Sequence, residues 1–433
     1  MTNSTSDDPG YPSTRSGYYV TFVLLAAYTL SFIDRQILGF MVDPVKRDLH
    51  LSDTSVSLLH GFAFAIFYTA VGLFLGRFAD RYNRRRLIIL GVTFWCAATI
   101  ACGFADNYWE LFAARVLVGV GEATLSPAAY SIIADYFPRP KRARPIGIYS
   151  AGVYIGSGLA FIVGGAVIQA TGTSNDFVII GLGQFHSWQL AFIIVGLPGL
   201  LMVPLLLTIR EPMRHDVEAA SPGLRYFVQH RGFYLPAMAG FAVLAIVTFA
   251  YTAWLPTSFV RTWGWSPGQI GLAYGLTMLA AGAGGMVSAG WFSDRMIGKG
   301  RLDAPITLSI KATLAAVPVS GALAFTRSPE IALTLVAITT FLASVSIALA
   351  PTAFQSVTPN QLRGQSTALY LLLINLIGMG CGPTLVALVT DFWFDDEGKV
   401  LLSVAIVCTA AILCAAGLIA LSLRPYRSLR GNA

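Results

Sequence analysis

The chain of 433 residues is 55% hydrophobic and only 12% charged, and its formal net charge at pH 7 is +7. Soluble globular proteins carry about a quarter charged residues, so this composition excludes an ordinary soluble protein and indicates a membrane protein. The basic excess is typical of a chain that contacts anionic lipid headgroups at an inner membrane face, and we expect no nucleic-acid partner.

Apolar runs long enough to cross a membrane follow a short polar start. Residues 1–17 are polar and contain acids, unlike the basic start of a cleaved signal peptide, so we expect the first span to be retained. A transmembrane helix needs about 20 mostly apolar residues. The runs that meet this requirement are 18–42, 56–78, 86–105, 108–134, 143–170, 188–209, 232–260, 268–292, 304–325, 329–353, 364–389 and 399–423. They predict an all-helical fold of twelve transmembrane helices, because the short alternating segments of a membrane barrel are not seen.

The basic residues indicate on which side of the membrane the termini lie. Lysine and arginine are concentrated in segments on the side that both termini share, such as 77–86, 139–144 and 424–430. By the positive-inside rule, both termini are cytoplasmic. The five cysteines form no CxxC pair, so we expect no disulfide framework, no metal and no cofactor. The only Asn-x-Ser/Thr triplet begins at Asn3 in the cytoplasmic tail, which favours a bacterial inner (plasma) membrane.

The first and fourth spans contain four charges in otherwise apolar surroundings. Asp34 and Arg35 stand in the motif FIDRQ, and Arg115 and Glu122 lie seven positions apart, two turns along one helical face. A charge at the centre of a transmembrane helix costs about 2.5–3.5 kcal/mol on insertion scales, so such residues usually face a partner or water. From the rise per residue, Asp34 and Arg115 lie at similar depths, about 10–12 Å from the outer rim. The four charges sum to zero and can neutralise one another.

The chain contains an internal repeat that divides it into two halves. Two pairs of segments share their spacing: Gly76, Asp80 and Arg81 with Gly290, Asp294 and Arg295, and Pro138, Arg142 and Tyr149 with Pro359, Arg363 and Tyr370. Two six-helix bundles in parallel repeat explain both similarities. The predicted parts are a cytoplasmic N-terminal tail (1–17), an N-terminal bundle (18–209), a cytoplasmic linker (210–231), a C-terminal bundle (232–424) and a cytoplasmic C-terminal tail (425–433).

This repeat and its loop motif resemble the major facilitator superfamily, whose signature is a Gly-x-x-x-Asp-Arg loop between spans 2 and 3. Within that superfamily, the chain resembles the spinster-like lipid transporters in FIDRQ, GRFADRYNRR, RVLVGVGEATLSPAAYSIIADYFP, IGIYSAGVYIGSGLAFIVGG and IREP. The resemblance is densest from Ile33 to Gly165. It implies that spans 1, 4, 7 and 10 line a central cavity and that the substrate is a single-chain amphipathic anion, such as a lysophospholipid or a sphingoid phosphate. Gln36 stands where relatives often have an aromatic residue, and Asn83 stands where the superfamily motif often has glycine.

We predict a secondary active transporter that works by alternating access and is coupled to protons. Substrate binding and proton coupling are expected at Asp34, Arg35, Arg115 and Glu122. Arginine binds oxyanions bidentately, so Arg35 and Arg115 would hold the headgroup. A carboxylate displaced from its arginine takes up a proton more readily, so Glu122 or Asp34 would titrate. Two alternatives stay open: the proton and the substrate compete, or the pairs only fix helix packing.

Further predictions concern the cavity, the cytoplasmic loops and the class of protein. Polar points in the cavity are expected at Tyr68, Tyr370 and Asn375. A conformational latch is expected at Gly76, Asp80, Arg81, Arg84, Asp294 and Arg295, although Arg81 and Arg84 would also serve as plain topology anchors. The chain has no HExxH, GxSxG or Cys/His cluster, so we predict no enzyme, and the repeat argues against a channel. We expect a monomer whose partners are its substrate, protons and membrane lipids; a symporter of a small organic anion and a lipophilic drug exporter are the alternatives.

Overall fold

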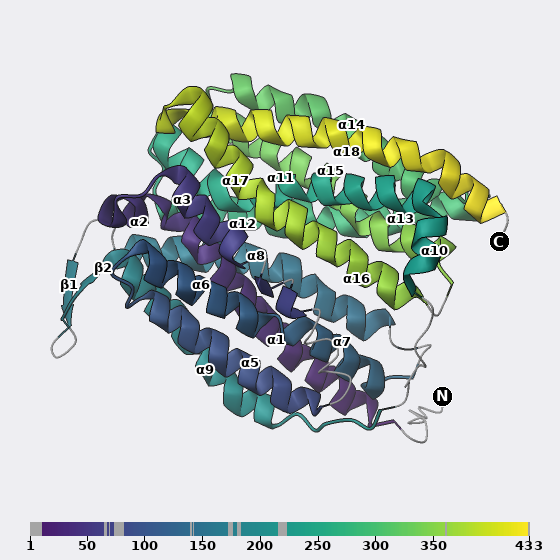
Figure 1. Ribbon diagram of the computed structural model, residues 1–433, viewed down its shortest axis with the longest axis horizontal. Coiled ribbons are helices and arrows are strands. Elements are labelled where there is room, and N and C mark those ends of the chain that lie inside the picture. Colours follow the sequence, from purple (N-terminus) through teal and green to yellow (C-terminus); the bar gives the residue numbers. More distant parts are fainter. Residues whose placement is uncertain are drawn as a thin grey trace, which may run out of the picture. The chain divides into compact units, whose positions relative to one another are not determined.

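Long helices dominate the computed structural model of the protein (Figure 1). It describes residues 11–64, 67–68, 70–72, 82–138, 141, 143–171, 176–179, 183–214, 223–359 and 362–431. The chain folds into two compact units: unit 1 contains Met1–Ile37 and Phe67–Ala219, and unit 2 contains Leu38–Ile66 and Ala220–Ala433. The segment 38–66 therefore packs with the later part of the chain, while the division of the sequence into two bundles at 210–231 stays a prediction.

Eleven helical stretches among the described residues are long and apolar enough to cross a membrane. They are Thr14–Phe40, Arg84–Cys102, Tyr108–Tyr136, Arg144–Ala170, Ser187–Leu207, Arg231–Trp263, Pro267–Gly298, Ala304–Phe325, Pro329–Val357, Arg363–Phe394 and Glu397–Arg430. Each corresponds to one predicted run, with ends that differ by a few residues. The remaining predicted run, 56–78, extends beyond the described part of the chain. The protein is thus a helical, multi-pass membrane protein.

Unit 1 is a helical bundle with one small hairpin. Its elements are α1 (Thr14–Ile37), α5 (Arg84–Cys102), α6 (Tyr108–Glu122), α7 (Leu125–Tyr136), α8 (Ala143–Thr171), β1 (Asp176–Ile179), β2 (Gly183–His186) and α9 (Ser187–Leu207). Helix α1 packs along α8, and α5 packs against both α6 and α9. The core contains Trp95, Tyr136 and Tyr149 among many aliphatic side chains, all of them buried. Burial of these apolar faces against one another orders the helices of the unit.

Two glycines let helices of unit 1 approach closely. A Cβ atom on Gly156 of α8 would lie 2.8 Å from the Cβ of Phe32 on α1. A Cβ atom on Gly121 of α6 would lie 2.7 Å from the Cβ of Trp95 and 2.8 Å from its backbone nitrogen on α5. Small residues at such positions allow the close backbone packing typical of membrane helices. These contacts hold α8 close to α1 and α6 close to α5.

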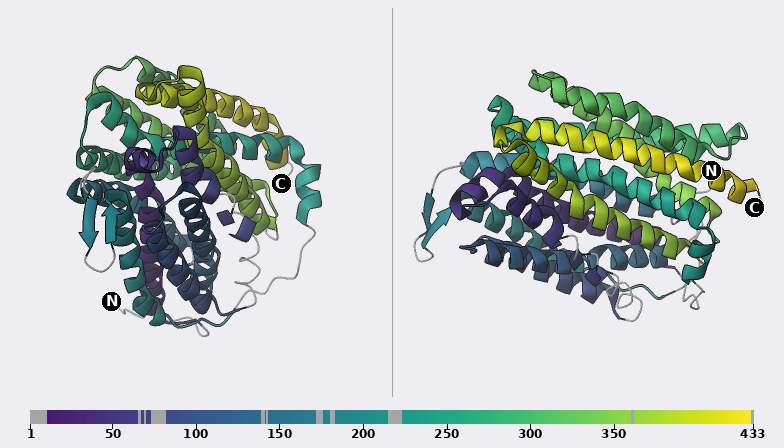
Figure 2. Two further views of the ribbon diagram at one scale, coloured as in Figure 1. Left: turned by 60° about the vertical axis from the view of Figure 1, so that its left-hand side comes forward. Right: turned by 45° about the horizontal axis from the view of Figure 1, so that its top comes forward.

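The hairpin of unit 1 was not predicted from the sequence. Strands β1 and β2 are antiparallel, with Asp176 opposite His186 and Ile179 opposite Gly183. The ribbon views show the hairpin projecting beyond the ends of the helices of its own unit (Figure 2). In the chain it lies between α8 and α9, outside the stretches that are long enough to span a membrane.

Unit 2 consists of the short segment Leu38–Ile66 and of the helices that follow Ala220. The early elements are η1 (Leu38–Phe40), α2 (Val42–Leu49), α3 (Asp53–Ser57) and η2 (Leu58–Phe62). The later elements are α10 (Gly223–Gln229), α11 (Arg231–Trp263), α12 (Pro267–Thr277), η4 (Met278–Gly282), α13 (Ala283–Gly298), α14 (Ala304–Ala322), η5 (Leu323–Phe325), α15 (Pro329–Val357), α16 (Arg363–Leu373), η7 (Ile374–Met379), α17 (Gly380–Leu388), η8 (Val389–Phe394), η9 (Glu397–Lys399) and α18 (Val400–Gly431).

The long helices of unit 2 form its core, and the early elements pack on them. Helix α11 packs along α18, and α14 packs against α15 and α18. Elements α3 and η2 pack against α17, while η1 packs against α11. Four elements of this unit, η2, η4, η7 and η8, are π-helical turns. Such turns are uncommon and often occur at functional positions, and sequence patterns do not reveal them.

The glycine contact between α5 and α6 predicts a sensitive packing position. We expect Gly121→Ala to lower the free energy of unfolding by about 1–3 kcal/mol, because the added methyl group overpacks against Trp95. The matched control is Gly147→Ala on α8, where a Cβ atom would meet nothing within 4 Å. Thermal unfolding of the purified variants in detergent measures both effects. Equal stability of the two variants would contradict the assigned helix contact.

Candidate functional site

Four charged side chains lie inside unit 1 on two helices. Asp34 and Arg35 occupy the last turn of α1, and Arg115 and Glu122 lie on α6. Asp34, Arg115 and Glu122 are buried, and Arg35 is nearly so. The structure thus brings together all four residues predicted for substrate binding and proton coupling, while their roles stay predictions.

The first of two ion pairs joins Arg35 to Glu122. Arg35 Nε donates a hydrogen bond to Glu122 Oε2 at 2.5 Å. The guanidinium carbon of Arg35 also lies 5.1 Å from the centroid of the Phe32 ring and 4.8 Å from that of the Tyr68 ring. A carboxylate and two aromatic faces therefore surround this cation, an arrangement that suits the flat, weakly hydrated guanidinium. Tyr68, a predicted cavity residue, belongs to this site.

The second ion pair joins Asp34 to Arg115 and includes a residue that the sequence analysis missed. Arg115 NH1 lies 3.7 Å from Asp34 Oδ1, which is close enough for an ion pair but too long for a hydrogen bond. Thr99 on α5 donates its hydroxyl hydrogen to Asp34 Oδ2. A single threonine in an apolar span gives no signal in the sequence, because threonines in membrane helices usually bond to their own backbone. Its contact with Asp34 depends on how α5 packs beside α1.

Each of the two buried carboxylates has one oxygen in hydrogen bonds and one without. Asp34 Oδ1 and Glu122 Oε1 have no hydrogen-bond partner among the residues that the structure describes. Buried polar atoms of this kind are rare and often mark a functional position. The site is neutral as a whole, and either carboxylate oxygen offers an acceptor to a proton or to a donor on a ligand. At each arginine, an anionic ligand that enters the site can replace the carboxylate of Asp34 or Glu122 that is paired with it.

The backbone places Glu122 at the end of its helix. Helix α6 ends at Glu122 and α7 begins at Leu125. Thr124, in the break, donates its hydroxyl hydrogen to the carbonyl oxygen of Gly121 at 2.8 Å. The preceding turn is held against α5 through the Gly121 contact with Trp95. A helix break of this kind, buried within the protein, is tolerated because side chains satisfy the freed backbone groups.

A second buried charge network lies at the start of α5. The N-cap residue Asn83 accepts a hydrogen bond from the Arg86 backbone nitrogen, and the helix begins at Arg84. The Arg84 guanidinium donates to Asp135 on α7 and, through Nε at 2.7 Å, to Glu211 after α9. Glu211 also accepts from the backbone nitrogens of residues 84 and 85, so it lies at the positive end of the helix dipole. The sequence did not predict a role for Asp135 or Glu211, because they lie 51 and 127 positions after their partner Arg84.

The remaining predicted site residues are distributed over both units. Tyr370 is buried on α16, where its ring centroid lies 5.3 Å from that of Phe354. Asn375 lies in the π turn η7. Asp294 and Arg295 are exposed on α13, with the Arg295 guanidinium 5.4 Å from the Trp291 ring. The other predicted latch residues, Gly76, Asp80 and Arg81, lie outside the described residues. Among the residues that are described, no group of three His, Cys, Asp or Glu side chains could hold a metal ion.

Comparison with known proteins gives a consistent family assignment. The sequence-family model of the Major Facilitator Superfamily matches residues 24–383 of this chain. An MFS-type efflux pump of Mycolicibacterium smegmatis is 27% identical, over 94% of this chain and 92% of the pump. Protein spinster of Drosophila melanogaster is 25% identical, over 73% of this chain and 52% of its own length, so this chain spans about half the length of that relative. The crystal structure of a bacterial homologue of the human lysosomal transporter Spinster, in an inward-facing and unoccupied conformation, has a TM-score of 0.77 and 26% identity, with 97% of this chain and 98% of that chain covered.

The Arg84 network predicts a large effect on stability. We expect Arg84→Ala to lower the free energy of unfolding by about 3–5 kcal/mol, because it leaves Asp135 without its buried partner. The matched control is Arg86→Ala, an exposed arginine in the first turn of the same helix. Thermal unfolding in detergent measures the difference. If both variants lose the same stability, Arg84 is only one of several interchangeable basic anchors.

Proposed function

Because the chain belongs to the major facilitator superfamily, we propose that it moves an amphipathic anionic lipid by alternating access coupled to protons. At the coarser level it is a multi-pass membrane transporter of the spinster-like type. The proposed substrate class is a lysophospholipid or a sphingoid phosphate, in line with the motifs around FIDRQ. The proposed location is a bacterial inner membrane, in line with the bacterial relatives.

One observation carries the proposal: α1 and α6 bury two cation–anion pairs whose charges cancel. A charge inside a membrane protein is costly and is usually retained for function. An anionic headgroup binds where a cation is available, and it must then replace the carboxylate already bound there. The two pairs therefore supply both the affinity for an anion and the internal anion that competes with it.

Access to the site favours Arg35 as the first contact of the headgroup. The Arg35 side chain is 12% exposed, whereas the Glu122 side chain is fully buried and Arg115 is 1% exposed. A phosphate that enters unit 1 thus reaches Arg35 before Arg115. Arg115 contacts the headgroup only after its pair with Asp34 has rearranged. The apolar surroundings of both helices suit the single acyl chain that follows such a headgroup.

Glu122 is the proposed proton acceptor. When the headgroup takes the place of Glu122 at Arg35, the carboxylate loses its counter-charge within an apolar environment. It gains a proton and becomes a neutral carboxylic acid, because the neutral form is the cheaper one there. Asp34 is less suited to this role, since the Thr99 hydroxyl already donates to its carboxylate and stabilises the charged form. Headgroup binding and proton uptake are therefore linked.

A second candidate function is export of a lipophilic compound. It is favoured by the similarity to an MFS-type efflux pump, which extends over 94% of this chain. In that case protonation of a carboxylate would change the two ion pairs without any anionic ligand. The substrate would bind to the apolar surface beside them. The two candidates differ in whether an anionic headgroup is required.

Transport into proteoliposomes tests the proposal. We expect a labelled lysophospholipid and a labelled sphingoid phosphate to be taken up, and labelled gluconate to be excluded. Arg35→Ala removes a charge-assisted contact of about 1.5–3 kcal/mol, so uptake should fall roughly ten- to hundredfold. The control is Arg47→Ala, an exposed arginine that pairs with its neighbour Asp48.

Three results would contradict the proposal. Uptake of gluconate alone indicates a small-anion symporter. Uptake of an uncharged lipophile at the same rate as the lipids indicates the exporter. Lipid uptake that is unchanged in Arg35→Ala shows that the two ion pairs do not bind the substrate.

A further inference from the structure

Lys311 of unit 2 is a charge inside a membrane-spanning stretch that takes no part in the two ion pairs of unit 1. It lies on α14, seven residues after Ala304, so its Cα atom is about 10 Å along the axis from the start of that helix. The side chain is exposed, and among the described residues it makes no hydrogen bond or ion pair. A charge at this depth is costly and requires a partner or water.

Helix α14 has one face in the core of unit 2 and the opposite face on its surface. The helix packs against α15 and α18 (Figure 1), and the hydroxyl of its buried Ser320 accepts from Thr409 of α18 at 3.1 Å. Lys311 lies nine positions before Ser320, two and a half turns away, and therefore on the opposite side of the helix. Leu314, three residues further along that side, is half-exposed. This apolar surface suits contact with lipid acyl chains.

Polar groups continue from Lys311 along the same face to the start of α14. Thr307 lies one turn before Lys311, and the N-cap residue Asp303 lies one turn before Thr307. Thr307 donates its hydroxyl hydrogen to Asp303 Oδ2 at 3.1 Å. Arg427 of α18 donates to the same oxygen through Nε at 2.8 Å and through NH2 at 2.5 Å. Neither of these bonds uses Arg427 NH1, and the side chain is more than half exposed, so NH1 is available to a further acceptor.

Arg301 adds a third cation at the start of α14. It is exposed and lies two residues before Asp303. Burial alone would raise the pKa of the Asp303 carboxyl. The hydrogen bonds from Arg427 and Thr307 and the charges of both arginines outweigh burial and bring this pKa below its ordinary value of 3.8. Asp303 is therefore ionised at neutral pH, and with the three cations around it, Arg301, Lys311 and Arg427, the local net charge is +2.

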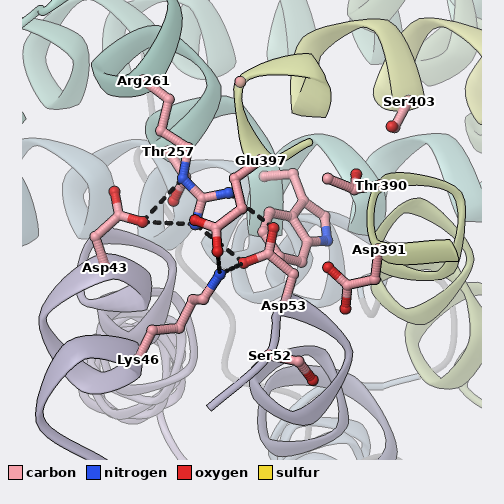
Figure 3. Close-up of polar contacts among 12 residues, drawn as sticks. Asp43, Lys46, Ser52, Asp53, Thr257, Arg261, Thr390, Asp391, Glu397 and Ser403 are labelled. Atoms are coloured by element: carbon pink, nitrogen blue, oxygen red, sulfur yellow. Dashed lines mark hydrogen bonds and ion pairs between the residues drawn. The ribbon is translucent and has the colours of Figure 1, made fainter. Parts of the chain in front are cut away.

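A charge cluster at the other end of unit 2, by the predicted topology, is paired internally instead. Arg261 donates to Asp53 Oδ2 at 2.7 Å (Figure 3). Lys46 donates to Asp53 and, at 2.6 Å, to Glu397 Oε1. The side chains of Lys46 and Arg261 are only 7% and 9% exposed, and carboxylates of the protein compensate both cations. The three cations around α14 share one carboxylate and are exposed, so their charge is available to a ligand from outside the chain.

We propose that the exposed face of α14 binds an anionic phospholipid of the cytoplasmic leaflet. The phosphate lies beside Thr307, where Lys311 extends toward it from the membrane side, as long cationic side chains do near a membrane surface. Arg301 and the free NH1 of Arg427 contact the same phosphate, and an acyl chain lies along Leu314. A local charge of +2 favours phosphatidylglycerol over zwitterionic phosphatidylcholine. The site contains none of the residues proposed for transport, so this lipid is a bound component of the membrane and not the substrate.

Such a lipid connects two helices of unit 2. Lys311 is on α14 and Arg427 is on α18, and these helices already pack along each other. A phosphate between the two cations adds a contact to the one that Asp303 supplies. Because a ligand that binds only the folded protein stabilises it by mass action, phosphatidylglycerol should raise the thermal stability of the protein more than phosphatidylcholine does.

Native mass spectrometry of the purified full chain, released from micelles that contain phosphatidylglycerol and phosphatidylcholine in equal amounts, tests the site. We expect phosphatidylglycerol to be retained in preference to phosphatidylcholine. Lys311→Met keeps the length of the side chain and removes its charge, so the affinity for phosphatidylglycerol should fall about fivefold, equivalent to about 1 kcal/mol. Arg301→Ala should cause a similar loss. Lys311→Arg retains the charge and should bind phosphatidylglycerol like the unchanged protein.

The matched control is Lys399→Met, which removes a half-exposed lysine at the other end of unit 2 and should leave the affinity for phosphatidylglycerol unchanged. Unchanged affinity in both Lys311→Met and Arg301→Ala would overturn the proposal, and so would equal retention of phosphatidylcholine. An equal loss in Lys399→Met would also overturn it, since the lipid would then be held by the general basic charge of the chain. Displacement of phosphatidylglycerol by inorganic phosphate would assign the three cations to a soluble anion instead. None of these readouts depends on transport.

Discussion

Compensation of charge inside an apolar bundle is the constraint on which the rest of unit 1 depends. Arg35 and Asp34 are adjacent on α1, yet they pair with Glu122 and Arg115, which are two turns apart on α6. A shift of α1 by one residue along α6, about 1.5 Å, would therefore disturb both pairs at once. Glycine contacts set the spacing of α1 from α8 and of α6 from α5, the helices that carry and flank these pairs. Both ion pairs thus depend on the same placement of α1 along α6. A ligand that breaks one ion pair therefore also affects the other.

Charge pairs elsewhere in the protein differ in how open they are to water. Arg84 is enclosed on every side by Asp135, Glu211 and backbone carbonyl oxygens, which suits a permanent connection among α5, α7 and the end of α9. Arg261 on α11 donates to the carboxylates of Asp43 and Asp53, and two of its acidic partners, Asp43 and Glu397, are partly exposed. In the pair of Arg35, the acid Glu122 is fully buried while the arginine itself is 12% exposed, so a ligand reaches this pair from the side of its cation.

The sequence reveals residues whose burial in an apolar span costs much free energy. It does not reveal residues whose role depends on partners far away in the chain. Asp34, Arg35, Arg115 and Glu122 are visible because charges in apolar runs are expensive, and helical rise already places Asp34 and Arg115 at one level. The long spans are visible because each is a run of about 20 mostly apolar residues. Thr99 and Glu211 are not, because the contacts that give them a role join segments 65 and 127 positions apart. The π turns and the hairpin β1–β2 also stay hidden, since they depend on packing and not on a periodic pattern.

The central claim is that binding of the headgroup at Arg35 is coupled to the uptake of one proton from solution by Glu122. Calorimetric titration of the purified protein with a lysophospholipid, in buffers with different enthalpies of ionisation, counts the protons taken up per bound ligand. The account predicts about one proton per ligand in the unchanged protein and about none in Glu122→Gln, with Glu110→Gln, an exposed acid of the same helix, behaving like the unchanged protein. Tight binding without any proton uptake would contradict it, and so would the same uptake in Glu122→Gln.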